Sequence, residues 1–400
     1  MSLSLAARDR TALRRGRVAT SLLFGVFGTA LGTWTARIPA IKQGLGLSDG
    51  QLSIGLLVFA AGAITGMQVI GRLVDRYDSA RIMIPAALAE GAVLTLPAFA
   101  PNLTTLALAL FVFGAIHGTL NIAMNANAVE VERAWRAPIM SSFHAVYSIG
   151  GFLGAAIGGL FAHAGSSPAA TFLSVAALAV ALTMWARRWA YSAGAARSAA
   201  GQLAAGPPAP RPPATGSGMA GVLFLGVLAF CCFVGEGAAA DWSTVYLRDS
   251  LGSSPGFAAS AYAAFSIMMM VGRLLGDRLA AAVGPVRLVR GCGVLAAAGL
   301  GGALLVGHPI AGVVGFGCLG AGLSCIAPQV FSAAGNRDPA RAGQALARVV
   351  SIGWIGFVTG PVVIGATAEL FGLPRALTIP TLLALFVALT AAALRGPRQR

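Results

Sequence analysis

Charged residues are scarce in this chain of 400 residues, where they make up 10% of the sequence against 57% hydrophobic residues. A soluble domain usually contains about 25% charged residues, because polar groups have to cover a surface that faces water. The scarcity excludes a water-soluble globule, and the abundance of apolar residues excludes a disordered chain. The sequence therefore predicts an integral membrane protein whose outer surface mostly faces a lipid bilayer.

Lysine is almost absent, since Lys42 is the only one. No glycine-rich phosphate-binding loop ends at this lysine, so an ATP-driven pump is excluded. The five cysteines, Cys231, Cys232, Cys292, Cys318 and Cys325, lie in apolar stretches without zinc-type spacing, which is typical of small buried side chains. We find no cluster of catalytic, metal-binding or cofactor-binding residues and expect neither an enzyme, a metal site nor a cofactor.

Basic residues outnumber acidic ones, 28 to 13, and give a net charge of +15. They separate apolar runs instead of clustering on a polar module with aromatic platforms, so we expect no nucleic-acid partner. The apolar runs are long enough for spanning helices of about 20 residues. Six intervals hold one span each: Val18–Ala36, Gly50–Gly71, Pro212–Gly235, Ser250–Gly272, Val349–Ala368 and Ala376–Leu394.

Three longer intervals hold two spans each, which brings the predicted number of spans to twelve. They are Ile82–Val129, broken at Pro101-Asn102, Ala137–Ala186, broken at residues 165–168, and Gly291–Asn336, broken at residues 307–309. With the N-terminus inside, the outer segments contain only Arg37, Lys42, Arg248 and Arg375 of the 28 basic residues. Basic residues concentrate in cytoplasmic loops, so both termini are predicted to be cytoplasmic.

A Pro-, Gly- and Ala-rich segment at residues 191–217 cannot bury a core and predicts a cytoplasmic linker. It separates a six-helix bundle at residues 1–190 from a second at residues 218–400. Motifs recur about two hundred residues apart in the two halves. Gly71, Asp75 and Arg76 correspond to Gly272, Asp277 and Arg278. A duplication of six spans is typical of one class of secondary transporter.

The segment from Gly71 through Asp75-Arg76 to Arg81 resembles the loop signature of the major facilitator superfamily. Further sequence segments, including Ser141-Ser142-Phe143-His144 and Asp241-Trp242-Ser243, are similar to those of the bacterial inner-membrane YbjJ-like branch. The resemblance implies twelve helices as two six-helix pseudo-repeats in the cytoplasmic membrane. It also implies a gate that includes Gly71, Asp75, Arg76, Arg81, Gly272, Arg273, Asp277 and Arg278.

In this family spans one, four, seven and ten line a central cavity for the solute. Span one carries Thr29, Thr33 and Arg37 on one helix face, and span four carries His117, Asn121 and Asn125 with the same spacing. Span ten adds Ser324. These residues are the candidate cavity residues, because polar groups at membrane depth usually face a cavity or another helix. Packing hydrogen bonds between helices are the alternative interpretation.

Glu236 in span seven is the leading candidate for proton coupling, since it is the only acidic residue well within a presumed cavity helix. A carboxyl group among apolar neighbours can bind a proton and release it when water enters. A static contact with Arg37 or Asn121 is the alternative. His144 is the second coupling candidate because imidazole titrates near neutral pH, although a structural role is also open.

The sequence thus predicts a monomeric secondary transporter for a small polar solute, driven by protons or another coupling ion. The alternative is a receptor or scaffold of the same fold that does not transport. The substrate, the direction of transport and the coupling ion cannot be predicted from these residues.

Overall fold

The computed structural model describes residues 2–192 and 217–395, and these contain helices but no strands. Residues 193–216 of the predicted linker lie outside this described part. Twelve helical segments are long and apolar enough to cross a membrane, which confirms the predicted number. The three predicted breaks are also confirmed, since spans end at Phe99, His163 and Val306 and resume at Leu103, Pro168 and Pro309.

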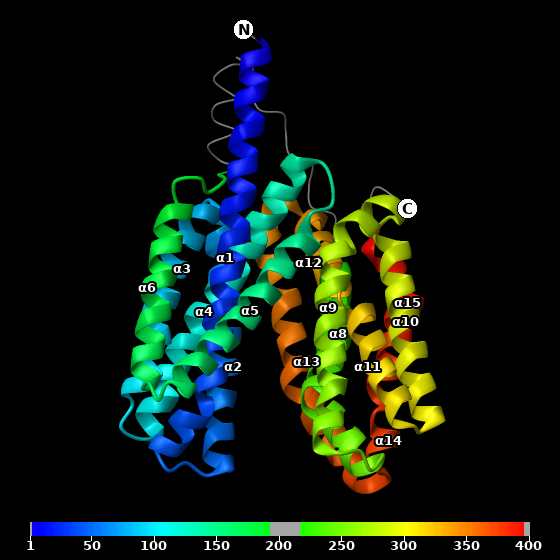
Figure 1. Ribbon diagram of the computed structural model, residues 1–400. Helices are drawn as coiled ribbons and strands as arrows, with labels where there is room; N and C mark the ends of the chain where they lie inside the picture. The colour runs from blue at the N-terminus through cyan, green and yellow to red at the C-terminus, as the bar shows by residue number, and fades with distance from the viewer. Residues whose placement is uncertain (1, 193–216, 396–400) are drawn as a thin grey trace. The chain divides into compact units, whose positions relative to one another are not determined.

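The first six spans form from seven elements that follow one another in the chain (Figure 1). They are α1 (Ser2–Gly44), α2 (Asp49–Arg76), α3 (Ser79–Leu94), the 3₁₀ turn η1 (Leu96–Phe99), α4 (Leu103–Trp135), α5 (Met140–His163) and α6 (Pro168–Ala186).

The last six spans form from the elements after residue 216. They are α8 (Ser217–Val245), η2 (Tyr246–Ser250), α9 (Pro255–Val283), α10 (Pro285–Val306), α11 (Pro309–Leu323), α12 (Ile326–Arg337), η3 (Pro339–Arg341), α13 (Ala342–Phe371), α14 (Leu373–Ala376), α15 (Thr378–Thr390) and η4 (Ala391–Leu394).

Local sequence signals explain where many of these helices begin. Ser48 accepts a hydrogen bond from the Gln51 N–H, and the Gln51 side chain accepts one from the Ser48 N–H. This reciprocal pair satisfies two of the N–H groups that a helix start leaves unpaired. Ser167 and Ser254 cap α6 and α9 in front of a proline, which suits the first helical position.

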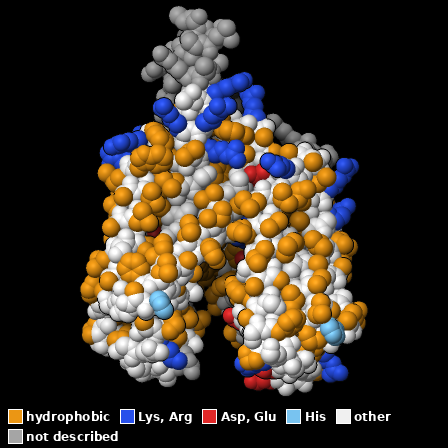
Figure 2. All heavy atoms as spheres, in the orientation of Figure 1, with side chains coloured by type: hydrophobic (Ala, Val, Ile, Leu, Met, Phe, Trp, Pro, Cys, Tyr) orange, Lys and Arg blue, Asp and Glu red, His pale blue; other side chains and the backbone are white. Residues whose placement is uncertain are grey.

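Helix α1 is longer than its predicted span and runs from Ser2 to Gly44 with Pro39 inside it. It projects beyond the ends of α3 and α6 (Figure 1). Figure 2 shows Lys and Arg side chains gathered at this end of the first unit, while hydrophobic side chains cover the flanks of its helices. Val69 of α2 and Phe152 of α5 are large apolar side chains that are 62% and 73% exposed.

The chain divides into two compact units, and each unit includes a short segment from the other half of the sequence. The first unit comprises Met1–Ala137, Val146–Met219 and Asp338–Ala347, and the second comprises Pro138–Ala145, Ala220–Arg337 and Arg348–Arg400. The first turn of α5 therefore belongs to the second unit, and the first turn of α13 belongs to the first. The boundaries predicted at residues 190 and 218 remain a prediction.

Glycines bring α2 and α4 into backbone contact within the first unit. A Cβ on Gly66 would meet the carbonyl of Ala115, and a Cβ on Gly118 would meet the carbonyl of Ala63. Small residues spaced by four allow such approaches between helices in lipid. Gly150 and Gly154 of α5 approach α1 in the same way.

The tenth span is interrupted between Leu323 and Ile326. Pro328 explains this break, because proline has no N–H to donate to the carbonyl four residues earlier. The amide of Gln329 then resumes the helical pattern by donating to the carbonyl of Cys325 at 3.2 Å. The interruption places Ser324 and Cys325 at the junction of α11 and α12.

Candidate functional site

Asp75 binds the start of α13 within the first unit. Its carboxylate accepts the backbone N–H of Gly343 at 2.6 Å, the N–H of Gln344 at 3.1 Å and the side-chain amide of Gln344 at 2.9 Å. The start of a helix has unpaired N–H groups and a partial positive charge, so a carboxylate stabilises it. The gating role of Asp75 stays a prediction.

The other gate candidates in the first half of the sequence are Gly71, Arg76 and Arg81. A Cβ on Gly71 would approach the Ala347 side chain to 2.8 Å, so glycine permits the close packing of α2 against α13. Arg76 is exposed and lies over the ring of Tyr77 at 5.6 Å, and Arg81 is exposed as well. Gly71 and Asp75 are thus the residues of this signature that we find in contact with α13.

Asp277 makes the equivalent contact in the second unit. Its two carboxylate oxygens accept the N–H groups of Ser141 at 2.8 Å and Ser142 at 3.1 Å, in the first turn of α5. Gly276 permits this approach, since a Cβ there would come within 2.6 Å of the Ser141 hydroxyl. The partners of the two aspartates, Ser141, Ser142, Gly343 and Gln344, were not predicted from the sequence. The internal repeat could have identified them. Gly343 and Gln344 follow Ser141 and Ser142 at the same distance along the chain at which Asp277 follows Asp75.

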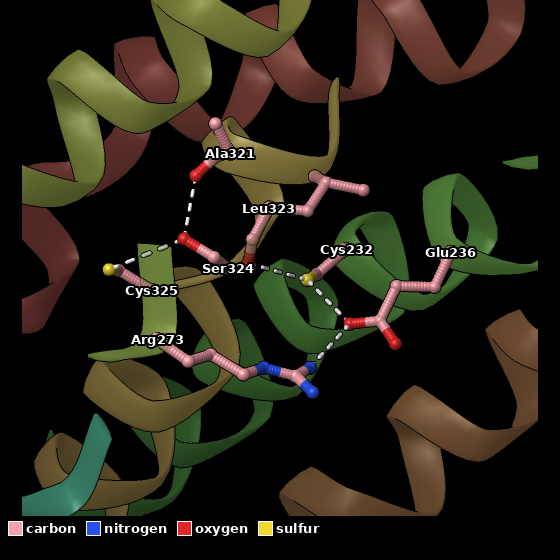
Figure 3. A network of polar contacts seen from close by, with 7 residues as sticks. All are labelled: Cys232, Glu236, Arg273, Ala321, Leu323, Ser324 and Cys325. Atoms are coloured by element: carbon pink, nitrogen blue, oxygen red, sulfur yellow. Dashed lines mark hydrogen bonds and ion pairs between the residues drawn. The ribbon is translucent and has the colours of Figure 1, made fainter. Parts of the chain in front are cut away.

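Glu236 pairs with Arg273 inside the second unit (Figure 3). Oε1 of Glu236 on α8 lies 3.4 Å from Nη2 of Arg273 on α9, and the two side chains are 21% and 8% exposed. The Cys232 thiol lies 3.8 Å from Oε1 of Glu236 and 3.7 Å from the carbonyl of Leu323. Within the second unit Glu236 is thus paired with Arg273, which the sequence assigns only to the gate.

His144 lies in the α5 turn that Asp277 holds. Its ring packs against Phe331 with 5.6 Å between centroids, and the side chain is buried. Arg273 is near enough to act on it electrostatically. The structure therefore gathers three candidates, Glu236, Arg273 and His144, into one polar cluster of the second unit.

The cavity candidate His117 lies among aromatic and acidic side chains of four helices. It is fully buried within the first unit, where Nδ1 lies 2.6 Å from Oε1 of Glu90 on α3. The imidazole stacks on Phe27 with centroids 3.9 Å apart, and Phe59 and Phe113 lie around it. His117 therefore joins α1, α2, α3 and α4 in the interior of the unit, and its role as a cavity residue stays a prediction.

The span-one candidates contact neighbouring backbone. Thr29 donates to the carbonyl of Gly25 at 2.9 Å, and Thr33 donates to Thr29 at 2.8 Å and to Gly154 at 3.2 Å. Arg37 is buried, and its Nη2 donates to the carbonyl of Ser166 at 2.5 Å. These contacts are hydrogen bonds of the kind that packs helices together, the alternative to a cavity role.

The side chains of Asn121 and Asn125 on α4 contact each other. The Asn125 amide donates to the Asn121 carbonyl at 2.8 Å and to its side-chain oxygen at 3.0 Å, while Oδ1 of Asn125 has no hydrogen-bond partner among the residues described. Ser324 donates to the carbonyl of Ala321 at 2.6 Å (Figure 3). In the described ranges, no three His, Cys, Asp or Glu side chains gather as metal ligands.

Comparison with known proteins identifies the family to which the chain belongs. The sequence profile of the Major Facilitator Superfamily matches residues 20–342 and again residues 227–400. A chain of Yersinia pestis described as an uncharacterized MFS-type transporter is 32% identical over 94% of this chain and 95% of its own. Membrane protein MosC of Rhizobium meliloti is 30% identical over 90% and 85%. The chain belongs to the Major Facilitator Superfamily.

Solved structures agree on the fold. The transporter FucP in its outward conformation has a TM-score of 0.72 at 18% identity and covers 94% of this chain and 98% of its own. The symporter XylE has a TM-score of 0.72 at 14% identity, with 95% of each chain covered. As a member of the Major Facilitator Superfamily, the protein is an integral membrane transporter and not an enzyme. Its predicted place in the YbjJ-like branch stays a prediction.

Proposed function

We propose that the chain is a monomeric, proton-coupled secondary transporter that moves a small polar solute across the cytoplasmic membrane by alternating access. Both termini lie in the cytoplasm in this proposal, in agreement with the distribution of basic residues. The observation that carries the proton coupling is the pair of Glu236 and Arg273, which is largely removed from solvent.

A pair of this kind has two stable protonation states. The ionised carboxylate is stabilised by the Arg273 guanidinium, whereas separation of the two groups in an apolar interior favours the neutral acid. Any conformational change that alters the distance between the groups or admits water therefore changes the affinity of Glu236 for a proton. By linkage, binding of the proton changes the conformational equilibrium in return.

The names of the structural neighbours are consistent with this mechanism. FucP is described as a fucose:proton symporter and XylE as a proton:xylose symporter. We assign solute binding to Asn121 and Asn125 in the first unit and to Ser324 in the second, with Thr29, Thr33 and Arg37 as further candidates. Amide and hydroxyl groups can both donate to and accept from the hydroxyls of a polar solute.

The experiment is a flux measurement on the purified chain in liposomes that contain a pH-sensitive dye. The panel consists of L-fucose, D-xylose and small organic anions, the last because the human neighbour MFSD10 is described as an organic anion transporter. Each solute is first tested for thermal stabilisation of the protein. We expect at least one stabilising solute to enter the vesicles together with protons. Solute flux without any proton flux contradicts the coupling, and binding without flux favours a receptor or scaffold.

A further inference from the structure

Arg273 is paired with the Glu236 carboxylate and shares α9 with Asp277, the residue that holds α5. It is one helical turn before Asp277 on α9, and residues four apart on a helix are neighbours with about 5–6 Å between Cβ atoms. Asp277 in turn holds the N–H groups of Ser141 and Ser142. One arginine is thus paired with a carboxylate on α8 and lies beside a second carboxylate on its own helix.

Other titratable groups of the second unit also face this arginine. Among them are Cys232 from α8, His144 from α5, and Cys325 from the junction of α11 and α12. Arg273 and Asp277 both act electrostatically on Cys325, which agrees with their proximity. Gln329 of α12 approaches the Ser141 hydroxyl at 3.5 Å. Glu236, through its ion pair, and Asp277, one turn along α9, are two carboxylates that can neutralise Arg273.

We propose that Arg273 transmits the protonation state of Glu236 to the contact between Asp277 and the start of α5. This inference rests on the proposed proton coupling and adds the residue through which it acts. With Glu236 ionised, Arg273 is neutralised on α8 and Asp277 is available to the α5 amides. With Glu236 protonated, Arg273 turns toward Asp277 and competes with Ser141 and Ser142 for its oxygens.

Charge explains why this competition weakens the hold on α5. A carboxylate stabilises a helix start through its negative charge as well as its hydrogen bonds, and pairing with a guanidinium neutralises that charge. The guanidinium also occupies lone pairs that the amides need. Since α5 passes from the second unit into the first after Ala145, release of its first turn frees the chain where it crosses from one unit to the other.

Hydrogen exchange of backbone amides, followed by mass spectrometry, tests this proposal without any solute. Glu236→Gln mimics the protonated acid, and we expect exchange in peptides that contain Ser141 and Ser142 to rise about tenfold, corresponding to about 1.4 kcal/mol. In the double variant Glu236→Gln/Arg273→Gln no cation competes for Asp277, so exchange should return to the wild-type rate. The amides of Gly343 and Gln344, held by Asp75, are the internal control and should not change.

The proposal is wrong if exchange at Ser141 and Ser142 is unchanged in Glu236→Gln, or rises equally in the double variant. It is also wrong if both contacts loosen together, because that indicates general destabilisation. Accumulation of a solute from the flux panel, measured on the same preparation, separates the two claims. Loss of accumulation with unchanged exchange leaves the coupling role of Glu236 standing and removes Arg273 as its transmitter.

Discussion

Oε1 of Glu90 and Nδ1 of His117 lie 2.6 Å apart in the interior of the first unit, and neither side chain is exposed. We expect Glu90→Leu and His117→Leu each to lower the free energy of unfolding by roughly 3–5 kcal/mol, because each leaves a buried polar partner behind. The double variant should lose less than the sum of the two. Thermal unfolding in detergent measures this, and strictly additive losses would show that the two groups do not act as a pair.

The contact of Asp75 with α13 gives the second prediction. Asp75→Asn keeps the shape but removes the charge, so we expect faster exchange of the Gly343 and Gln344 amides and slower transport, with normal membrane insertion. Asp249→Asn is the matched control, since Asp249 is half exposed and forms an ion pair with its neighbour Arg248. Unchanged exchange and unchanged transport in Asp75→Asn would remove this residue from the gate.

The third prediction concerns helix packing. Gly118→Ala places a methyl group against the Ala63 carbonyl of α2, so we expect a lower unfolding temperature and less protein in the membrane. Gly159→Ala is the control, because no described atom lies within 4 Å of a Cβ at that position and alanine favours the helix. Equal effects of the two substitutions would contradict the close approach of α2 and α4.

Topology is tested with a reporter that is active only outside the cytoplasm. Fused after Arg400 it should be silent, and inserted at Gly307–Pro309, between the ninth and tenth spans, it should be active. The physical reason is the concentration of basic residues in the segments assigned to the inside. The opposite result at either position would overturn the predicted orientation.

The spans could be predicted because bilayer thickness sets their length and a few residues set their ends. Pro101, Pro168 and Pro309 each stand at a break that the structure confirms. The end of α1 was placed too early, at Ala36, because the prediction ended each span at the first charge. The helix continues through Arg37 instead, because the charge of Arg37 is accommodated by a hydrogen bond from its guanidinium to the carbonyl of Ser166.

Side-chain partners were predicted less well, because periodicity identifies a helix face but not the helix that it meets. His117 shares its face with Asn121 and Asn125, yet it turns to Glu90 in the interior of the unit. The partner of Glu236 was missed for a related reason. Arg273 matched the gate signature, and a motif gives no information on which neighbouring helix a long side chain reaches.

The most direct test of proton coupling is a comparison of two transport modes in liposomes that contain Glu236→Gln, with Glu369→Gln as the control. Glu369 is exposed near the end of α13 and should behave as wild type. Glu236→Gln cannot exchange a proton, so it should lose accumulation of solute driven by a pH gradient and keep exchange of labelled for unlabelled solute. Gradient-driven accumulation with normal pH dependence in Glu236→Gln would contradict the account, and His144 would then be the next candidate.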